Sequence, residues 1–418
     1  MSKEYFDEFG VPTEALLGKA FPPEFDGPVK REPLFRIQEW GVDRFSGDAP
    51  EIEWLIEDIL PTETPGMVCS LGGVGKSYLM MDLCVRLAAG PGIGASFAMG
   101  GRIPRRGRAV MITAEDSSKA LHRRLDQIIQ ESEKPKLRDW LYIVPLADHQ
   151  GQKSLMAVHG GEYVMTEVWD DLVEQIVEIS EMPGGLDLLV LDPLAAMVMA
   201  DVNSDPAAGA AFWGAISGLC ARVSCSCLVT HHMNKASLGG VEGPMGARES
   251  IRGTTSLVDS ARWVLALYLP SREEREAAEA ALGESIDPLG MVFSAVVKSN
   301  DLGMTEQRVF LRDAVSGLLT DATDEVAEAI DANKRLSSEQ IRACFDEVER
   351  RVAREDPFSG HPAGRERYLG NWLTREFKID KKSATGYVRD WLSKGYLIRY
   401  PHPRTQRAQG LRAAEIRP

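Results

Sequence analysis

The sequence contains no apolar run close to the roughly 18 residues that a membrane-spanning helix needs. Its first ten residues, MSKEYFDEFG, have no apolar core of the kind found in signal peptides. No internal repeat at a fixed period is found either, which argues against a solenoid or a propeller. Together these absences predict a cytoplasmic protein built from ordinary globular domains.

Cysteine is also scarce, with 6 residues in a chain of 418. This number is too small to supply the disulfide framework of a secreted scaffold. Cys225 and Cys227 stand one residue apart, but no second Cys or His pair follows at zinc-ligand spacing. We therefore expect reduced thiols in a protein core, with a metal site as the alternative.

Charge is unevenly distributed along the chain. The formal net charge is −14, yet residues 335–418 carry 18 Lys and Arg against 11 Asp and Glu. A basic tail on an acidic body predicts a separate module that meets phosphate groups. The alternative is a surface rich in solvated arginines. With 44% hydrophobic and 26% charged residues, the composition is that of a soluble globular protein, and the length allows two or three domains.

Nearly continuous apolar segments alternate with helical patterns over most of the chain. Such segments are typical of strands buried on both faces of a mostly parallel sheet, so the predicted fold class is α/β. Leu79, Leu83 and Leu87 recur at helical spacing, and Gly90-Pro91 ends that helix. The expected strands are Met67–Ser70, Ala109–Ala114, Leu141–Leu146, Leu188–Asp192, Cys225–Thr230, Arg262–Leu269 and Met291–Lys298.

The C-terminal part of the chain shows helical patterns followed by two short strands. The helices are expected at 337–355, 364–377 and 383–395, with Ser383 as the N-cap of the third. Tyr396–Tyr400 and Gly410–Ala413 predict a β-hairpin, and helices followed by a hairpin are typical of a winged helix-turn-helix. The predicted organisation is an N-terminal arm at 1–33, an α/β domain at 34–325, a linker at 326–336 and this module at 337–418.

The strongest motif is a glycine-rich turn between a predicted strand and a predicted helix. It matches the Walker A pattern G-x-x-x-x-G-K-[ST], except that Ser70 stands where the first Gly is expected. The backbone N–H groups of such a turn can wrap a phosphate at a helix N-terminus, and a chance turn would lack the strand and helix around it. ATP and Mg²⁺ are therefore the expected cofactors. The expected nucleotide-binding residues are Gly72, Gly73, Val74, Gly75, Lys76, Ser77 and Tyr78.

An apolar strand that ends in a carboxylate supports this site. Leu188–Asp192 has the Walker B form, and Asp192 would hold Mg²⁺ together with the hydroxyl of Ser77. Many ATPases place a catalytic Glu directly after this Asp. Here Pro193 follows, so the catalytic base is expected elsewhere.

Polar residues at the ends of two further strands are candidates for catalysis. Glu115 would orient the attacking water and take its proton. Alternatively, Glu115 and Asp116 only begin the next helix, where acidic residues favour the helix dipole. After the strand Cys225–Thr230, His232 could sense the γ-phosphate, whereas one of the two adjacent histidines is expected to be buried for packing. A zinc site from two neighbouring strand residues is disfavoured, because their side chains point apart.

These motifs together resemble those of RepA-type hexameric replicative helicases of plasmids, which belong to the RecA-like, DnaB-related P-loop ATPases of AAA type. The resemblance covers roughly residues 34–325. It implies a RecA-like fold and a ring of six subunits with ATP bound between neighbours. The motifs that carry it are Gly72–Ser77, Thr113–Asp116, Leu189–Asp192, Thr230–Lys235 and Asp259–Trp263.

The resemblance also implies roles for individual residues. Lys76 and Ser77 would bind phosphate and Mg²⁺, Glu115 would activate water, Asp192 would support the metal, and His232 would couple the γ-phosphate to DNA-contacting loops. Arg262 matches the arginine finger that reaches the neighbouring subunit's ATP, a contribution often worth roughly 10³–10⁵ in rate. From the sequence alone, Arg262 could equally form a surface salt bridge. Lys298 matches an interface position next to the neighbour's nucleotide.

Two loops are expected to face the channel of such a ring. One is Asp201–Ala208, and the other is the glycine-rich segment Asn234–Gly253 with Lys235, Arg248 and Arg252. Flexible backbone and cations suit contact with single-strand phosphates. The alternative is an ordinary mobile surface loop.

The leading hypothesis is therefore a homo-hexameric, ATP-driven motor that moves along single-stranded DNA and unwinds duplex during plasmid or phage replication, with a replication initiator or primase as a partner. The alternatives are a RecA-like ATPase that assists recombination, partition or transposition without unwinding, and a DNA-binding regulator. The C-terminal module departs from the RepA pattern and would bind duplex DNA, bind a partner or stabilise the ring. Its candidate phosphate contacts are Lys381, Lys382, Arg389, Lys394, Arg399, Arg404 and Arg407.

Overall fold

The structure is a computed structural model that describes residues 36–93, 95–234, 237, 240–241, 243–253, 255–301, 305–334 and 336–416. The side chains at 255–256, 331–334 and 406–407 are outside this description. The chain divides into two compact units, 1–51 and 52–418. In the first, two 3₁₀ helices are described, η1 (Ile37–Trp40) and η2 (Val42–Phe45), and the predicted arm at 1–33 lies outside the described residues.

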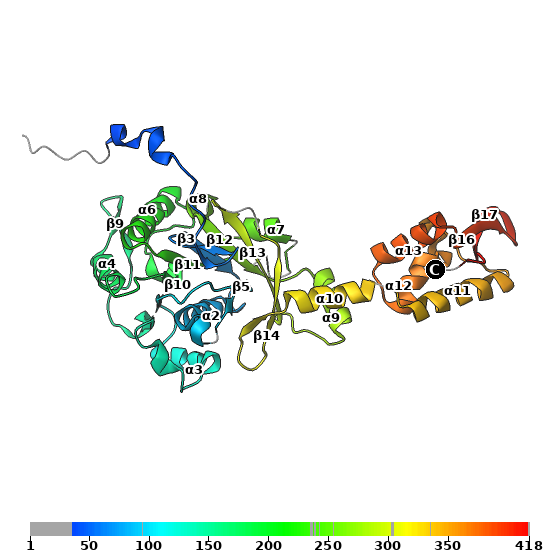
Figure 1. The fold of residues 1–418 in the computed structure, drawn as a ribbon, viewed down its shortest axis with the longest axis horizontal. Coiled ribbons are helices and arrows are strands. Elements are labelled where there is room, and N and C mark those ends of the chain that lie inside the picture. Colours follow the sequence, from blue (N-terminus) through cyan, green and yellow to red (C-terminus); the bar gives the residue numbers. More distant parts are fainter. Residues whose placement is uncertain are drawn as a thin grey trace, which may run out of the picture. The chain divides into compact units, whose positions relative to one another are not determined.

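The second unit is built on a nine-stranded sheet of order β15-β14-β13-β12-β3-β11-β10-β6-β7 (Figure 1). The strands from β12 to β7 are parallel to one another, whereas β13, β14 and β15 join antiparallel at one side. All seven predicted strands are confirmed, and β14 and β15 are additional. The bounds are β3 Pro65–Ser70, β6 Ala109–Thr113, β7 Leu141–Pro145, β10 Leu188–Asp192, β11 Ser226–His232, β12 Trp263–Tyr268, β13 Met291–Ser299, β14 Arg308–Arg312 and β15 Leu319–Asp321.

Apart from a C-terminal hairpin, three two-stranded sheets are seen among the described residues of this unit. They pair antiparallel as β1 with β2, β4 with β5, and β8 with β9. Their short, mixed sequences gave no strand signal. The bounds are β1 Trp54–Ile56, β2 Leu60–Pro61, β4 Phe97–Ala98, β5 Gly101–Arg102, β8 Met156–His159 and β9 Glu162–Met165.

Helices cover both faces of the large sheet (Figure 1). The helices α2 and α3 lie on one face, and α4 and α6 lie on the other. The apolar side chains of the parallel strands are buried between these layers. The helix bounds are α2 Lys76–Ala89, α3 Ser118–Ile128, α4 Glu167–Ser180, α5 Leu194–Met197, α6 Pro206–Val223, α7 Gly243–Glu249, α8 Thr255–Ser260, α9 Arg272–Leu282 and α10 Thr323–Lys334.

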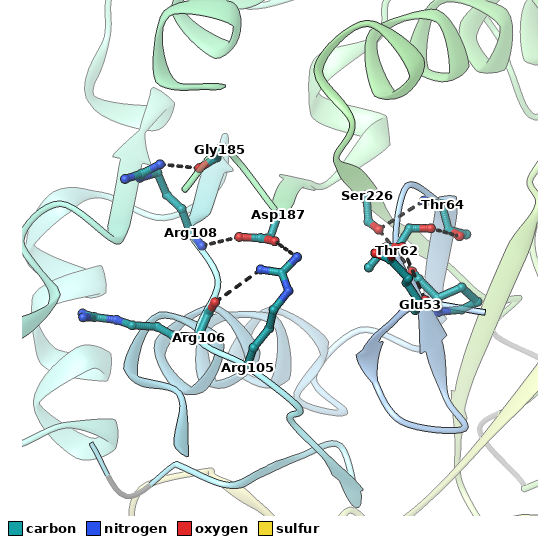
Figure 2. A network of polar contacts seen from close by, with 10 residues as sticks. Glu53, Thr62, Thr64, Arg105, Arg106, Arg108, Gly185, Asp187 and Ser226 are labelled. Carbon is teal, nitrogen blue, oxygen red and sulfur yellow. Dashed lines mark hydrogen bonds and ion pairs between the residues drawn. The ribbon is translucent and has the colours of Figure 1, made fainter. Parts of the chain in front are cut away.

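Polar side chains fix the N-terminal ends of the parallel strands (Figure 2). Asp187, which precedes β10, accepts the backbone N–H of Arg108 at 2.7 Å and pairs with Arg105 Nη2 at 2.7 Å. Ser226, the first residue of β11, accepts the backbone N–H of Thr64 at 3.1 Å. These contacts tie β6 to β10 and β3 to β11. They hold the parallel strands together at their N-terminal ends. The candidate site lies at the C-terminal ends of these strands.

The segment that follows the sheet begins with the predicted polar helix. In α10, Val326 is buried in the main core and Ile330 packs against it. The three predicted C-terminal helices and the hairpin are present, and they share an apolar core of their own. Their bounds are α11 Ser338–Ala353, α12 Leu369–Phe377, α13 Lys381–Ser393, β16 Leu397–His402 and β17 Thr405–Ala413.

The predicted cap of the third of these helices is wrong by three residues. Asp380, not Ser383, is the N-cap of α13, because its Oδ1 accepts the backbone N–H groups of Lys382 and Ser383, each at 2.9 Å. Asp380 is a stronger acceptor than a serine hydroxyl, and Ser383 itself donates to Asp380 Oδ2 at 2.6 Å.

Two further observations concern expectations from composition. No helix within the described part of the chain is long and apolar enough to cross a membrane. All six cysteines, Cys225 and Cys227 among them, are buried and free of disulfides.

Candidate nucleotide-binding site

The phosphate loop connects β3 to α2 at the C-terminal ends of the parallel strands. β3 ends at Ser70 and α2 begins at Lys76, so that Leu71–Gly75 form the turn between them. Gly73 and Gly75 have φ angles of +82° and +109°, in the left-handed region that favours glycine. The motif therefore has the predicted strand-turn-helix context.

Serine at position 70 fits the place where the Walker A pattern has its first glycine. Ser70 is fully buried at the end of β3, and its hydroxyl donates to Leu71 O at 2.9 Å. Beyond it, a Cβ built on Gly72 or Gly73 would meet no other atom within 4 Å. These glycines border open space at the N-terminus of α2, where backbone N–H groups favour an anion.

A buried polar cluster lies behind the loop. Lys76 Nζ is 3.3 Å from Thr230 Oγ1 and 3.6 Å from Asp192 Oδ1, and Thr230 Oγ1 donates to Asp192 Oδ1. Asp192 is fully buried, and its Oδ2 has no hydrogen-bond partner among the described residues. A buried carboxylate oxygen without a partner is costly, so this residue fits the expected place beside Mg²⁺ or its water ligands.

A cavity of about 240 Å³ opens onto the loop and onto Lys76 of this cluster, whereas Thr230 and Asp192 are not among its lining residues. Most of the residues predicted to act on a nucleotide line it: Gly72, Gly73, Gly75, Lys76, Ser77, Tyr78, Glu115 and His232. Val74 is different, because its side chain is fully buried in the core. Only the backbone of Val74 is then suited to meet a phosphate.

Glu115 lies on the cavity wall, two residues after the end of β6. It is exposed, and α3 begins only at Ser118 with Ser117 as its N-cap. Its neighbour Asp116 is held in an ion pair with Arg124. Of the two adjacent carboxylates, Glu115 is therefore the one for which the described residues show no ion pair.

The two histidines at the end of β11 have different surroundings. His231 is buried, its Nε2 lies 2.8 Å from Arg252 O, and burial lowers the pKa of His231 to about 4. His232 is half-buried on the cavity wall, where burial and then the charge of Lys76 lower its pKa. A neutral imidazole at this position can exchange a hydrogen bond with a phosphate oxygen.

Three residues of the site were not found from the sequence. Thr230 bridges Lys76 and Asp192, as described above. Arg312, from β14, lines the cavity and donates from Nη1 to Gly73 O at 2.8 Å across a separation of 239 residues. Arg124 also lines it, and no local pattern signals either arginine.

A second cavity of about 410 Å³ adjoins the first and shares Tyr78 and Arg124 with it. Tyr78 OH donates to Arg124 O at 3.2 Å, and the Arg124 guanidinium carbon lies 5.8 Å from the centre of the Tyr78 ring. Val315 and Ser316, from the turn between β14 and β15, complete one wall. An aromatic ring, a guanidinium and an apolar side chain thus lie beside the phosphate loop.

Arg262 lies far from the phosphate loop of its own chain. It is exposed and directly precedes β12, whose Trp263 pairs with Gly66 near the start of β3. The loop follows Ser70, which pairs with Leu267. Arg262 therefore lies near the N-terminal ends of the parallel strands, about 16 Å from the phosphate loop at the usual rise per strand residue.

Lys298 also lies outside the cavity and has a local structural role. From β13, its Nζ donates to the carbonyl oxygens of Val258 at 3.4 Å and of Asp259 and Ala261, at the end of α8. Burial lowers the pKa of Lys298. Cations at a helix C-terminus are stabilising, and the role toward a neighbour's nucleotide stays a prediction.

In the first predicted channel loop, Asp201–Ala208, the residues up to Asp205 form a compact turn and the remaining three begin α6. Asp201 Oδ1 accepts the backbone N–H groups of Asn203 and Ser204, each at 3.2 Å. Tyr163, from β9, donates to Asp205, which is also the N-cap of α6. The loop is therefore anchored to the β8–β9 hairpin.

Both ends of the second predicted loop, Asn234–Gly253, lie next to His231 and His232 at the end of β11. Met233 forms an antiparallel bridge with Ile251, and the backbone N–H of Arg252 donates to His232 O at 3.1 Å. Part of the loop is the helix α7, so it is less irregular than expected. Lys235 lies outside the described residues.

Part of the chain, including the phosphate loop, is similar to a known family. Residues 30–237 match the family model of the AAA domain. Among solved structures, the chain is similar to an ATPase domain (10% identity, TM-score 0.40, 62% of this chain and 85% of that one). It is also similar to a DnaB-like replicative helicase studied with primase (11%, 0.41, 62% and 57%) and to a KaiC-like protein from Pyrococcus horikoshii OT3 (14%, 0.37, 64% and 93%).

The chain thus spans 57% of the length of the DnaB-like helicase that it matches. The strand that carries the phosphate loop, β3, lies between β12 and β11, and the Walker B strand β10 follows β11 in the sheet. The loop, the buried Lys–Asp cluster and the Walker B strand all fall inside the segment that matches the AAA domain model. The chain therefore carries a phosphate loop and a Walker B strand on a mostly parallel sheet, within a segment that is similar to the AAA domain.

Proposed function

We propose that this protein is an ATP-driven motor of the RepA replicative helicase type, which assembles as a hexamer and translocates on single-stranded DNA during plasmid or phage replication. The observation that carries the proposal is the direct connection between the phosphate cavity and the loop Asn234–Gly253. His232 lines the cavity, and its own carbonyl oxygen accepts the N–H of Arg252 at the far end of that loop.

Residues of one chain bind the phosphates and prepare the attacking water. The turn Gly72–Gly75 offers backbone N–H groups, and Lys76 adds a positive charge. Glu115 orients a water molecule and accepts its proton, because it is the carboxylate of the cavity wall for which the described residues show no ion pair. The reaction class is hydrolysis of the bond between the β- and γ-phosphates.

Ser77 and Asp192 would hold Mg²⁺ in this site. The unpartnered Oδ2 of Asp192 supports this assignment, as do the hard oxygen ligands that the two side chains provide. When bound, the ion would neutralise charge on the phosphates. The hydroxyl of Thr230 donates to Asp192 Oδ1 and Lys76 in turn contacts Thr230, so that both residues fix the position of the Asp192 carboxylate.

The base of the nucleotide would occupy the second cavity. Tyr78 and Arg124 present a ring and a guanidinium plane, both of which stack on aromatic bases. Val315 at the turn between β14 and β15 adds apolar contact. Since Arg312 on the same hairpin bonds to Gly73, this hairpin would respond to the presence of nucleotide.

Arg262 would complete the site of a neighbouring subunit. Arg262 lies near the N-terminal ends of the parallel strands, and the phosphate loop lies at their C-terminal ends. This separation excludes contact with the nucleotide of its own chain unless the fold rearranges. A cation from the neighbour would stabilise charge that develops on the phosphates during hydrolysis. Such a site also requires assembly, which agrees with a ring.

Hydrolysis would be transmitted to DNA through the end of β11. Loss of the γ-phosphate changes the hydrogen bonds of His232, while the contact between His231 Nε2 and Arg252 O keeps the loop attached to the strand. The loop would then shift as a unit. Its Arg252 is exposed and supplies a cation for single-strand phosphates, whereas Arg248 is paired with Asp259 at 3.0 Å.

A forked-duplex assay tests the proposal. The wild type should separate the strands with ATP, and single-stranded DNA should stimulate hydrolysis. Lys76→Ala should do neither. DNA-stimulated hydrolysis without strand separation would instead support an accessory ATPase of recombination, partition or transposition. ATP hydrolysis with no response to single-stranded DNA would leave the regulator hypothesis.

A further inference from the structure

The C-terminal module presents one polar face of α13 to solvent. Ala384, Val388 and Trp391 recur at helical spacing and are buried in the module core. On the other side of the helix, Lys382, Thr385, Arg389 and Ser393 are all exposed. Both ends of this face therefore carry a polar or charged group, and the middle carries a small hydroxyl residue.

Not all of the basic residues predicted to contact phosphate are equally available. Lys394 pairs with Asp390 at 2.9 Å, and Arg404 pairs with Glu355 at 3.4 Å. The side chain of Arg407 lies outside the described residues. Of the seven predicted contacts, those that are exposed and for which the described residues show no ion pair are Lys381, Lys382, Arg389 and Arg399. Three of these four lie on α13.

Small residues between the cations allow a partner to approach closely. A Cβ built on Gly386 would meet no atom within 4 Å, and Thr385 next to it is exposed. The helix is 13 residues long, about 20 Å at the usual rise per residue. A helix of these dimensions fits the major groove of B-DNA, which is about 12 Å wide.

The entry to α13 also suits an anionic partner. Three residues, Lys378 to Asp380, connect α12 to α13, and Ile379 among them is buried in the module core. The two helices are therefore joined by a short turn that is fixed to the core. The N-terminus of α13 then carries Lys381 and Lys382 in its first turn, where the helix dipole adds positive potential.

The aromatic residues of the module argue against a single strand as its partner. Single-strand binding relies on bases that stack on accessible aromatic rings. Every Phe, Tyr and Trp within residues 336–416 is buried or half-buried, and most pack together in the module core. This surface therefore lacks the stacking platforms that a single strand requires.

A protein partner is also disfavoured. Protein interfaces depend on apolar and aromatic anchors that fill pockets on the other side. Among the described residues of the module, the large apolar side chains that are exposed are Ile398, at 38%, and Ile416, at 76%. Neither lies on α13. The positive charge of residues 335–418, against the negative remainder of the chain, points the same way.

We propose that α13 lies in the major groove of duplex DNA, with Lys382 and Arg389 on phosphates or base edges and Thr385 facing the bases. This surface is distinct from the phosphate cavity and from the loop Asn234–Gly253. It would give the chain a grip on double-stranded DNA that does not depend on ATP hydrolysis.

The test uses the full chain with Lys382 and Arg389 both changed to Ala, and with Lys394 and Arg404 both changed to Ala as the matched control. Binding to a labelled 30-bp duplex is measured by anisotropy over a salt series, with unlabelled single strand as competitor. Two lost phosphate contacts should weaken duplex binding about 30-fold near 0.15 M salt and reduce the salt slope by about 1.8. The control should change affinity less than about 3-fold.

ATP hydrolysis stimulated by single-stranded DNA should be the same in all three proteins, so failure of this inference is separable from failure of the motor proposal. Equal duplex affinity of the wild type and the Lys382/Arg389 variant overturns the proposal, as does an equal loss in the control. Absence of duplex binding by the wild type also overturns it. Retained affinity for a protein partner together with unchanged duplex binding would indicate a docking surface instead.

Discussion

Replacing Glu115 by Gln tests the assignment of the catalytic base. The change removes a charge and a proton acceptor while keeping the shape of the side chain. Glu115 is exposed on the cavity wall, so we expect the free energy of unfolding to change by less than about 0.5 kcal/mol. ATP binding should be retained or become tighter, because a negative charge would leave the cavity proposed to hold a polyanion.

The expected loss is in the chemical step. A positioned general base contributes roughly 10²–10⁴ in rate, which corresponds to about 3–5 kcal/mol of transition-state stabilisation. Single-turnover hydrolysis of radiolabelled ATP measures this step directly. Binding of a fluorescent ATP analogue to the same protein separates affinity from chemistry.

Asp116→Asn is the matched control for this experiment. Asp116 is adjacent in the chain and carries the same charge, but its carboxylate is occupied by Arg124. It should keep the single-turnover rate within several-fold of the wild type. Equal rates in Glu115→Gln and the wild type would refute the assignment, and equal losses in both variants would show that only the net charge of the cavity matters.

Two further predictions concern the loop and the buried histidine. Gly75→Ala places a Cβ at a φ of +109° and 3.2 Å from Leu319 Cδ1, so urea unfolding should show a loss of about 1–2 kcal/mol, whereas Gly72→Ala, which meets no atom, should unfold like the wild type. His231 has its pKa lowered from 6.5 to about 4 by burial, so the unfolded chain binds more protons between these values. Stability should therefore fall by up to about 3 kcal/mol as the pH drops from 6.5 toward 4, and His231→Gln should lack this part of the pH dependence in urea titrations. If His231→Gln showed the same pH dependence of stability as the wild type, the assignment of this pH dependence to His231 would be wrong.

The sequence predicted the central strands because their apolar runs are long and uniform. The strands β3, β6, β10 and β11 are buried on both faces, which requires the continuous hydrophobic pattern that was seen. The glycine turn was predicted for a similar reason. Gly73 and Gly75 adopt left-handed angles that few other residues tolerate, so the residue types are dictated by the local backbone.

The antiparallel strands β14 and β15 at one side of the sheet could not be predicted in the same way. β14 has the sequence Arg-Val-Phe-Leu-Arg, and its ends are only half-buried, so its pattern does not differ from that of a loop. Arg312 on this strand reaches Gly73 through the tertiary fold alone. The bridging role of Thr230 was missed because a threonine in an apolar strand is ordinarily a packing residue, and only the register of β11 beside β3 places it near Lys76.

The most direct test of the account is a mixing experiment with Arg262→Ala and Lys76→Ala. Each variant alone should hydrolyse almost no ATP, since one lacks the cation that reaches the neighbour and the other lacks its own phosphate-binding lysine. In an equal mixture, about a quarter of the interfaces pair an intact phosphate loop with an intact Arg262 from the next subunit, because the contact is head-to-tail. The account predicts that hydrolysis recovers to a corresponding fraction of the wild-type rate, with co-assembly confirmed by energy transfer between labelled subunits. Full hydrolysis by Arg262→Ala alone, or no recovery in assemblies shown to be mixed, would contradict it.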